Sequence, residues 1–455
     1  MLYQFLKPIV YTAVRIFYKK IVVVNREQLN QDGPTLIVSN HNNAFLDALL
    51  VAMFARPKIY SIARGDIFKR PVLNAILTKL CIIPIFRKEE GLELMHKNEA
   101  TFEKCIELLS NKQTIIMYPE GDCITEKRLR KLRKGAARIA LRAEAQNKFE
   151  LDVKILPVGL NYSAAKKFRS SVFINVGQPL SLKEYKEKYA QDSVKAINQL
   201  TNEMEGTMRQ LIVDLQLRSN DGLYEDLLKI YKPQLMYELH LNPDKLPQDF
   251  KANCEMANAI NYYSAEKPEL IEKLKHKIRD YMQGLQLLNL SVNLLNKPIQ
   301  NSGEIAEPNV LHLSLKAILL VIGMPFHLLG LLFNYAPYRL AYRTADKMVK
   351  QPHFHASVNF VIGMFGWIFY YLFQLGLIAL IEKNNLVTLI SAIAIPALGL
   401  YSLEFYSFLR KATAYYRFFQ VSRTNKPAIE QLIVQRNEIL QLLQEAQRDY
   451  CAEKK

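Results

Sequence analysis

The chain has 455 residues, and a usual domain has about 100–200, so two or three structural units are expected. Half of the residues are hydrophobic, which excludes a disordered or low-complexity protein. The net charge of +17 points to a polyanionic partner, namely nucleic acid, anionic lipid or a phosphorylated substrate. The five cysteines form no C-x-x-C pair and no grouping with histidine at metal-ligand spacing. We therefore expect neither a disulfide scaffold nor a zinc module, and a reducing compartment fits the chain better.

The N-terminal segment, residues 1–33, opens with a stretch that has basic residues and no acidic ones. On a helical projection Lys7, Arg15 and Lys19 share one side, and apolar side chains such as Phe5 and Ile9 occupy the other. This pattern predicts an amphipathic helix anchored on anionic lipid. The alternative is a helix docked on its own domain. No small-residue cleavage site follows, so we expect no removable signal peptide.

Residues 34–180 alternate short β-branched runs with helical stretches, which indicates an α/β domain with a mixed, largely parallel sheet flanked by helices. Ligands in such folds bind at the loops beyond the strand ends, so catalytic and binding residues are expected there. The expected strands are Thr35–Ser39, Ile59–Ile62, Ile82–Phe86, Thr114–Tyr118, Val153–Val158 and Val172–Val176. The expected helices lie near Phe45–Phe54, Val72–Leu80, Leu92–Leu109 and Leu132–Ala145.

Polar residues follow three of these strands. His41 comes after the first, and Asp47 follows six residues later. A carboxylate beside an imidazole holds one tautomer and leaves the other nitrogen as a general base. Arg87 directly follows Ile82–Phe86, where a guanidinium is able to grip a phosphate with two hydrogen bonds. Glu120 and Gly121 follow Thr114–Tyr118, where a carboxylate serves to bind a substrate hydroxyl, to hold a cation or to cap the turn.

A basic run comes next, with six basic residues in eight positions and no acidic residue before Arg142. We interpret it as attracting the phosphates of a substrate or of a nucleotide-bearing donor, with membrane-surface attraction as a compatible alternative. Nucleic acid is unattractive as the partner because no aromatic-interleaved patch or recognition motif accompanies the charge. The run consists of Lys127, Arg128, Arg130, Lys131, Arg133 and Lys134.

The second half of the chain carries the apolar segments. Residues 181–300 are polar and helix-like, and we predict a helical region without a catalytic signature. In the membrane region, 301–409, the runs 356–381 and 386–408 are predicted to form two transmembrane helices, since each is long enough to cross a bilayer. A buried hairpin of a soluble domain is the alternative. We expect 410–455 to be a basic cytoplasmic tail with an amphipathic helix.

The apolar stretch 311–336 is harder to assign because Pro325 lies near its middle, where a proline removes a helix hydrogen bond. If only the two clean segments cross, the basic loops and the basic N-terminal half lie on one side, as the positive-inside rule requires. We therefore favour a re-entrant or interfacial hairpin at 311–336. On this basis the protein is an integral membrane protein whose catalytic domain faces the cytoplasm.

Taken in order, the polar clusters resemble the glycerolipid acyltransferases, the family of lysophosphatidate and glycerol-3-phosphate acyltransferases. His41 and Asp47 resemble its N-H-x-x-x-x-D box, and Ile85-Phe86-Arg87 resembles its second block. The third and fourth blocks correspond to Tyr118-Pro119-Glu120-Gly121 and Leu156-Pro157-Val158, and Lys134-Gly135 to the Lys-Gly pair that often trails the third block. Five residues separate His41 from Asp47 where the common pattern has four. Tyr118 stands in place of the usual Phe, and Asp122 in place of the usual Thr.

The resemblance implies a reaction. His41 would take the proton from a glycerol hydroxyl, Asp47 would orient the imidazole, and Arg87, Glu120, Gly121 and Lys134 would form the phosphate site. The donor would be acyl-CoA or acyl-carrier protein, and the acceptor a phosphorylated glycerol or lysolipid in contact with membrane lipid. No metal and no other cofactor is implied, and the absence of a G-x-S-x-G elbow fits a mechanism without an acyl-enzyme.

Other readings of the same residues stay open. One is an acyltransferase that remodels another lysophospholipid or an aminolipid. A second is a catalytically silent membrane scaffold with the same fold. A third is a lipid hydrolase or transacylase that uses the same base.

Overall fold

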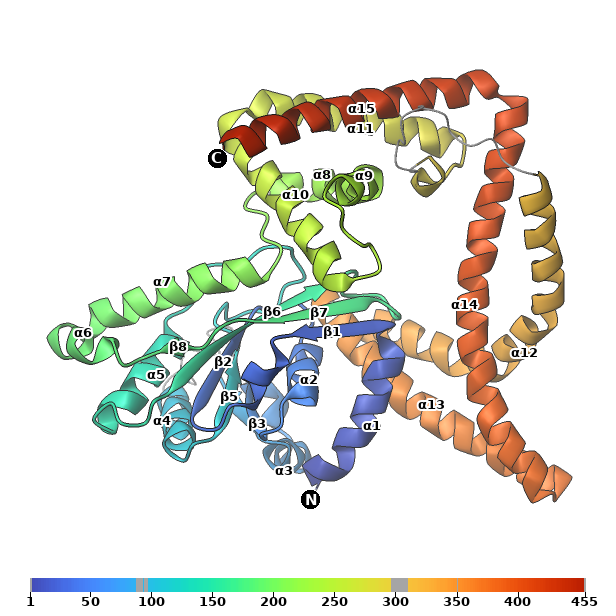
Figure 1. Ribbon diagram of the computed structural model, residues 1–455. Helices are drawn as coiled ribbons and strands as arrows, with labels where there is room; N and C mark the ends of the chain where they lie inside the picture. The colour runs from blue at the N-terminus through green and yellow to red at the C-terminus, as the bar shows by residue number, and fades with distance from the viewer. Residues whose placement is uncertain (1, 87–92, 94–96, 296–309, 350, 454–455) are drawn as a thin grey trace. The chain divides into compact units, whose positions relative to one another are not determined.

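The computed structural model describes residues 2–86, 93, 97–295, 310–349 and 351–453 (Figure 1). The chain divides into two compact units. The first comprises Met1–Asp214 together with Met348–Phe360, and the second comprises Leu215–Lys347 together with Val361–Lys455.

The described strands of the first unit form one eight-stranded sheet in the order β1-β7-β6-β2-β5-β3-β4, with β8 paired to β6. The pairs β1–β7, β2–β5, β2–β6, β3–β5 and β3–β4 are parallel, and β6 pairs antiparallel with β7 and β8. The predicted mixed, largely parallel sheet is therefore confirmed. The strands are β1 Lys20–Val24, β2 Thr35–Ser39, β3 Ile59–Arg64, β4 Ile82–Ile85, β5 Thr114–Met117, β6 Lys154–Tyr162, β7 Ser171–Val176 and β8 Leu180–Ser181.

Both faces of the central strands are buried, as expected where a parallel sheet is covered by helices. Leu36 and Ile115 belong to one core cluster with side chains of α4, α5 and α7. Ile37 and Ile116 follow them in sequence, so they face the opposite side, and they are equally buried. The helices of this unit are α1 Leu2–Phe17, α2 Phe45–Phe54, α3 Pro71–Lys79, α4 Lys97–Ser110, α5 Gly135–Gln146, α6 Tyr185–Gln191 and α7 Ser193–Leu211.

Two features of this unit lie outside the predicted α/β segment. The predicted N-terminal anchor holds the helix α1 and also the strand β1, which pairs with β7 at one edge of the sheet. Beyond Leu180, the helix α7 contributes Leu200 and Met204 to the core of the sheet, so the first unit extends to Asp214.

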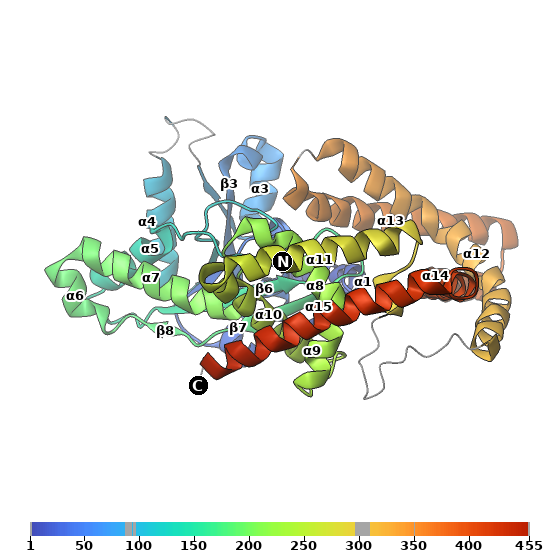
Figure 2. The ribbon, with the colours of Figure 1, turned by 90° about the horizontal axis from the view of Figure 1, so that it is seen from above.

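The second unit is helical throughout its described elements. Its helices are α8 Asp221–Ile230, α9 Lys232–Glu238, α10 Leu246–Glu266, α11 Pro268–Leu287, α12 Val310–Met348, the greater part of α13 Pro352–Glu382, α14 Asn385–Thr424 and α15 Lys426–Glu453. The helices α11 and α15 run side by side (Figures 1 and 2). They are antiparallel, because Lys277 Nζ lies 2.6 Å from Glu438 Oε2 while Gly284 packs against Leu432.

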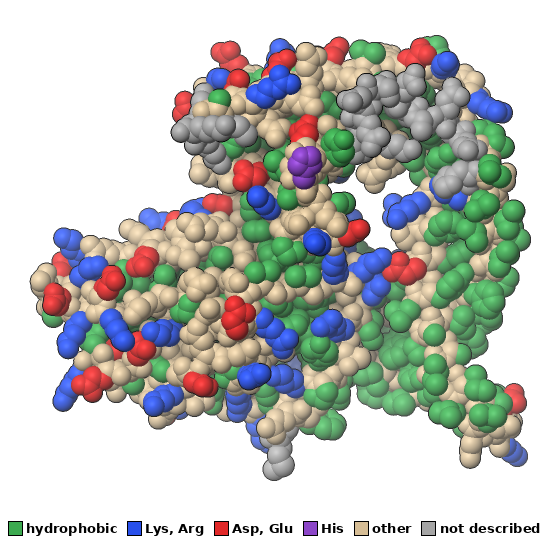
Figure 3. All heavy atoms as spheres, in the orientation of Figure 1, with side chains coloured by type: hydrophobic (Ala, Val, Ile, Leu, Met, Phe, Trp, Pro, Cys, Tyr) green, Lys and Arg blue, Asp and Glu red, His purple; other side chains and the backbone are tan. Residues whose placement is uncertain are grey.

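Among the described residues, three helices are long and apolar enough to cross a membrane, namely α12, α13 and α14. Figure 3 shows hydrophobic side chains gathered over the part of the surface formed by α12 and α14. At 311–336 the structure differs from the expected hairpin, because α12 is one helix of 39 residues that contains both Pro325 and Pro337.

The packing of these three helices compensates for two of their interior prolines. Pro337 has no N–H for the carbonyl of Phe333, and Gln374 Nε2 donates to that carbonyl at 3.0 Å. Pro396 likewise frees the carbonyl of Ala392, which accepts a hydrogen bond from the Tyr371 hydroxyl. Side chains of α13 therefore replace two backbone donors that proline removes, as apolar surroundings require.

Candidate active site

Three parallel strands bring the polar clusters to one edge of the sheet. Since β2 pairs in parallel with both β5 and β6, the carboxyl ends of all three strands lie at the same edge. His41 follows β2, Glu120 follows β5, and Tyr162 ends β6. Residues far apart in sequence therefore meet where ligands bind in α/β folds.

His41 and Asp47 form the predicted pair. The His41 Nδ1 atom lies 2.8 Å from Asp47 Oδ2, and the side chain of Asp47 is fully buried while 14% of the His41 side chain is exposed. A carboxylate only accepts hydrogen bonds, so Nδ1 carries the proton and donates it to Asp47. The other ring nitrogen, Nε2, is then unprotonated and available as a base.

Asp47 is held by four donors. Besides His41 Nδ1, its Oδ2 atom accepts from the backbone N–H groups of Asn42 and Asn43 at 2.9 and 2.8 Å. Its Oδ1 atom accepts from the hydroxyl of Tyr162. Burial, followed by the nearby charge of Asp47, raises the pKa of Tyr162 well above its ordinary value, so the phenol keeps its proton and acts as donor. These contacts satisfy a buried carboxylate that would otherwise be unstable.

The loop between His41 and α2 contains a strained turn. Ala44 has a φ of +45°, in the region that side chains other than glycine rarely adopt. The Ala44 N–H donates to Cys123 Sγ at 3.0 Å, and Thr125 Oγ1 donates to the Asn42 carbonyl at 2.8 Å. The segment after β5 therefore fixes the turn that carries His41 toward Asp47.

A residue from the C-terminal half of the chain also holds this loop. Ser357 is buried in the first turns of α13, which belong to the first unit, and its Oγ donates to the Asn43 carbonyl at 2.9 Å. On the other side of the loop, Asn43 Nδ2 donates to the Tyr18 hydroxyl at 3.1 Å.

The ring of Tyr118 covers one face of the His41 imidazole. It stacks on the imidazole with the ring centroids 4.0 Å apart and an interplanar angle of 15°. Burial raises the pKa of Tyr118 well above its ordinary value, so the ring stays a neutral phenol. The substitution of Tyr for Phe in the family block thus keeps an aromatic surface against His41.

Glu120 links the histidine loop to the basic segment. Its Oε1 atom accepts from the backbone N–H of His41 at 2.8 Å, and its Oε2 atom accepts from Arg130 Nε at 3.0 Å. Burial raises the pKa of Glu120, and the charge of Arg130 and these hydrogen bonds oppose that rise. Glu120 thus acts here as an anchor for the backbone beside His41.

Much of the basic segment is neutralised from within the chain. Besides Arg130, Arg133 pairs with Asp122 at 3.0 Å and Arg128 lies 3.2 Å from Glu126. Gly121 has a φ of +82°, which residues other than glycine rarely adopt, and a Cβ atom there would lie 2.2 Å from Arg133 Nε and displace that side chain. The remaining basic residues differ in exposure: Lys127 is half-buried, and Lys131 and Lys134 are exposed.

Arg87, the predicted phosphate-binding residue after β4, lies outside the described residues. The chain immediately before it is fixed by an asparagine of α4. The Phe86 N–H donates to Asn98 Oδ1 at 2.8 Å, and Asn98 Nδ2 donates to the Phe86 carbonyl at 2.7 Å.

His41, Asp47 and Cys123 also place ligand atoms within 4.8 Å of one another, the spacing of a metal site. The donor set does not suit a resident metal. Both oxygens of Asp47 already accept hydrogen bonds, and burial raises the pKa of the Cys123 thiol, so this group does not readily supply the thiolate that a metal needs. We derive no chemistry from a metal at this place.

Several residues of the site were not identified from the sequence. Tyr162, Cys123, Thr125 and Ser357 belong to no recognisable motif, and their contacts join parts of the chain that only the fold brings together. A sequence signal existed for Tyr162 alone, because it lies four residues beyond the predicted strand Val153–Val158.

Comparison with known proteins identifies the class. Residues 20–161 match the family model described as Acyltransferase. The first unit of the chain therefore contains a region that matches the acyltransferase family model, and the resemblance seen in its motifs is confirmed.

Two individual relatives show which acyltransferases the chain is similar to. Over 197 residues the chain is 25% identical to glycerol-3-phosphate O-acyltransferase 2 of Saccharomyces cerevisiae, a match that covers 42% of this chain and 25% of the yeast protein. Over 125 residues it is 27% identical to a chloroplastic 1-acyl-sn-glycerol-3-phosphate acyltransferase of Arabidopsis thaliana, covering 27% of this chain and 33% of the plant protein. The chain thus spans a quarter to a third of these relatives.

A solved structure matches as well. It is the crystal structure of the 1-acyl-sn-glycerophosphate acyltransferase from Thermotoga maritima, with 22% identity and a TM-score of 0.30. The match covers 43% of this chain and 79% of that protein.

Proposed function

We propose that this protein is a membrane-bound O-acyltransferase of phospholipid biosynthesis. It transfers a fatty acyl group from acyl-CoA or acyl-carrier protein to a glycerol hydroxyl of glycerol-3-phosphate or lysophosphatidate. The observation that carries the proposal is the His41–Asp47 pair, in which a fully buried carboxylate orients a largely buried but still accessible base at the ligand-binding edge of the sheet.

In the proposed reaction His41 Nε2 accepts the proton of the acceptor hydroxyl as its oxygen attacks the carbonyl carbon of the thioester. The new C–O bond forms, the C–S bond breaks, and the proton passes from the imidazole to the departing thiolate. Asp47 stabilises the imidazolium that exists between these steps, and the four donors around Asp47 keep it in position. Tyr118 restricts the imidazole to one plane.

We assign the acceptor phosphate to Arg87 and Lys134, with Gly121 shaping the turn beside them. Lys127, Arg128, Arg130, Lys131 and Arg133 provide a positive field that attracts the phosphates of acceptor or donor. Within this group the exposed Lys131 is free to move toward a ligand, whereas Arg130 and Arg133 are engaged by Glu120 and Asp122. Glu120 contributes by holding the backbone of His41 and not by direct contact with phosphate.

A membrane location follows from the substrates and from the surface of the protein. The helix α1 exposes Phe5, Ile9 and Ile16 beside its basic residues, which suits an interfacial helix on anionic lipid. The helices α12, α13 and α14 have the length and composition of membrane spans. We place the catalytic unit on the cytoplasmic face, because the basic loops lie on the same side as this unit when α13 and α14 alone cross the bilayer.

An acceptor panel tests this proposal. The purified protein in phospholipid nanodiscs is incubated with radiolabelled palmitoyl-CoA or palmitoyl-acyl-carrier protein and with glycerol-3-phosphate, lysophosphatidate or monoacylglycerol. We expect ester product with one of the two phosphorylated acceptors, and at least tenfold less with monoacylglycerol, which has the hydroxyls but no phosphate.

Each contrary result has a distinct meaning. Product formed equally well from monoacylglycerol contradicts the phosphate site. Release of free palmitate in place of ester identifies a hydrolase. Inactivity with every donor and acceptor, in protein that melts cooperatively, favours a scaffold that keeps the acyltransferase fold.

A further inference from the structure

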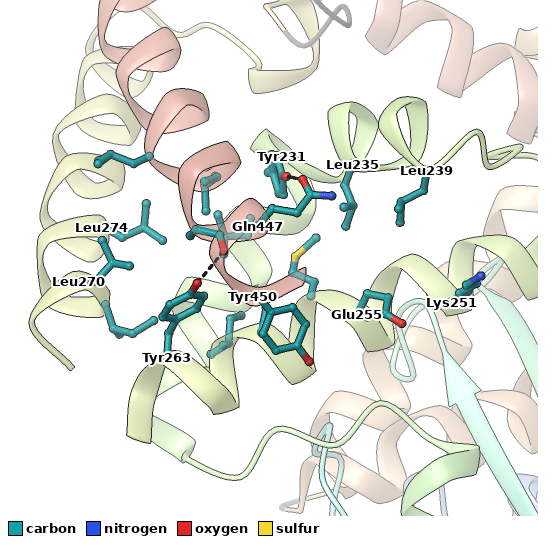
Figure 4. A pocket seen from close by; sticks show the side chains of 18 residues that line it. Tyr231, Leu235, Leu239, Lys251, Glu255, Tyr263, Leu270, Leu274, Gln447 and Tyr450 are labelled. Carbon is teal, nitrogen blue, oxygen red and sulfur yellow. Dashed lines mark hydrogen bonds between the residues drawn. The ribbon is translucent and has the colours of Figure 1, made fainter. Parts of the chain in front are cut away.

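The second unit contains a cavity that the proposed reaction does not use. It has a volume of about 360 Å³ and is lined by α8, α9, α10, α11 and α15. Figure 4 shows side chains of these helices pointing into it, most of them aliphatic or aromatic. Native interiors rarely leave voids much larger than a water molecule. A cavity of this volume lies within the range of about 300–1,000 Å³ that is typical of ligand pockets.

The cavity is elongated and differs in polarity along its length. Leu270 and Leu274 of α11 lie at one end, and Leu239 and Lys251 lie at the other (Figure 4). Leu274 is buried, whereas Lys251 is exposed to solvent. Glu255 also lines the cavity, one helical turn from Lys251, so this end carries one charge of each sign. A ligand that matches this arrangement has a long apolar part and a polar end whose anionic group reaches the exposed Lys251.

The volume sets the size of the apolar part. An apolar cavity of about 150 Å³ holds benzene, which corresponds to about 25 Å³ per carbon atom. On that scale the present cavity of 360 Å³ accommodates about fourteen carbon atoms. This is the size of one long hydrocarbon chain and too small for the two chains of a mature phospholipid.

The walls suit such a chain. The hydroxyl of Tyr263 donates to the Ala446 carbonyl at 2.6 Å, and the hydroxyl of Tyr231 donates to Gln447 Oε1 at 2.6 Å. The polar atoms of both rings are thus satisfied by α15, so the rings present apolar faces to the cavity and need no polar ligand. The helix α15 begins two residues after α14, one of the candidate membrane spans, so the same unit has access to membrane lipids.

We propose that this cavity binds the hydrocarbon chain of one single-chain anionic lipid, with its head at Lys251 and its tail toward Leu270 and Leu274. A free fatty acid and a lysophosphatidate share this chemistry. The proposal extends beyond acyl transfer, because nothing in the chemistry of His41 requires a lipid to be held in the second unit.

Photolabelling tests the site. The full chain in phosphatidylcholine nanodiscs is irradiated with palmitic acid that carries a diazirine near its methyl end, and the labelled peptides are mapped by mass spectrometry. We expect label on α11 and α15 close to Leu270, Leu274 and Leu443, and competition by unlabelled palmitate. Competition by lysophosphatidate at lower concentration than palmitate would identify the lysolipid as the better ligand.

Two variants of α10 form a matched pair. Ala259 lines the cavity and Ala265 is exposed on the same helix, so Ala259→Phe fills the cavity and Ala265→Phe does not. We expect at least tenfold less label in α11 and α15 for Ala259→Phe, with unchanged label for Ala265→Phe and with both variants melting cooperatively. Lys251→Gln is expected to weaken palmitate competition about fivefold.

Other results would contradict the lipid site or the proposed orientation of the lipid head. Label confined to α12–α14, or label in α11 and α15 that Ala259→Phe leaves unchanged, refutes the site. Unchanged competition in Lys251→Gln refutes the proposed orientation of the head. Specific labelling in a protein that fails every acyl-transfer assay would leave this site standing and remove the proposed function alone.

Discussion

Two segments of the first unit stand out in the sequence for their chemistry, and the fold treats them differently. The loop from His41 to Asp47 has the predicted pairing, with an Nδ1–Oδ2 distance of 2.8 Å. The segment 127–134, which reads as an uninterrupted positive run, has Arg130 and Arg133 paired with Glu120 and Asp122. A histidine and a carboxylate six residues apart meet through local geometry. The acidic partners of the basic segment lie just before it in the chain, so the segment taken alone does not show how much of its charge is free.

Glu120 joins the loop from His41 to Asp47 to the segment 127–134. One oxygen of this carboxylate holds the backbone of His41 and the other holds Arg130. The basic segment therefore has two roles: Arg130 supports the catalytic loop from within, and Lys131 and Lys134 remain exposed for ligands. Variants of single residues in the two segments separate these roles.

The largest effect is expected for Asp47→Asn. An amide at this position no longer holds Nδ1–H of His41 in one tautomer and no longer stabilises the imidazolium, so kcat falls by about 10²–10⁴-fold. The measurement is the steady-state rate of ester formation in nanodiscs, with circular dichroism as the check on folding. A folded Asp47→Asn protein within threefold of the wild-type rate would show that the carboxylate does not assist the base.

The second effect separates two arginines of the basic segment. Arg130→Met leaves the buried Glu120 without its ion pair, so we expect a loss of about 2–3 kcal/mol in the free energy of unfolding, together with reduced activity. Arg133→Met removes the partner of the more exposed Asp122, and the expected loss is below about 0.5 kcal/mol. Equal losses in thermal melting would contradict the distinct roles of the two residues.

A smaller effect is expected from the exposed lysines. The double variant Lys131→Ala and Lys134→Ala removes charge without breaking a described ion pair. We expect KM for the phosphorylated substrate to rise about three- to tenfold at low ionic strength, and the difference to shrink in 0.5 M salt. The matched control is Lys186→Ala with Lys195→Ala, which removes two exposed charges elsewhere in the first unit. The same rise in KM in both double variants would indicate a general effect of net charge.

The smallest effect is a pH dependence of stability. The pKa of Glu120 is raised in the folded protein, so this group binds its proton more tightly when folded than when unfolded. Its contribution to stability is therefore complete below about pH 4.5 and is lost as the pH rises through the folded pKa. We expect the melting temperature of the wild type relative to Glu120→Gln to fall across that interval. A difference that is constant with pH would show that Glu120 titrates normally.

The sequence predicted the sheet well because its strands are short β-branched runs bounded by loops. The range Thr35–Ser39 matches β2, and Phe45–Phe54 matches α2. The strand β1 was not predicted, because Lys20–Val24 closely follows an amphipathic helix and its sequence resembles a continuation of that helix. Its partner β7 lies about 150 residues further along, and no local pattern reports that pairing.

The membrane region shows the same limit. Pro325 argued for a broken segment at 311–336, but α12 continues through this proline and also through Pro337. The carbonyl that Pro337 leaves free is bonded by Gln374, a residue of the next helix. The expectation that a proline breaks a helix considers that helix alone. It does not take account of a hydrogen-bond donor from a neighbouring helix. For the same reason Tyr162 and Ser357, which hold Asp47 and its loop, were absent from the predicted site.

The most direct test of the account is the rate of acyl transfer by His41→Ala measured beside His276→Ala. Both positions carry a histidine within 3.0 Å of an aspartate, but the His276 side chain is 73% exposed on α11 and has no part in the proposed reaction. We predict that His41→Ala loses at least a hundredfold in kcat while its melting temperature stays near that of the wild type, and that His276→Ala retains full activity. A well-folded His41→Ala protein that forms ester at the wild-type rate would contradict the central claim.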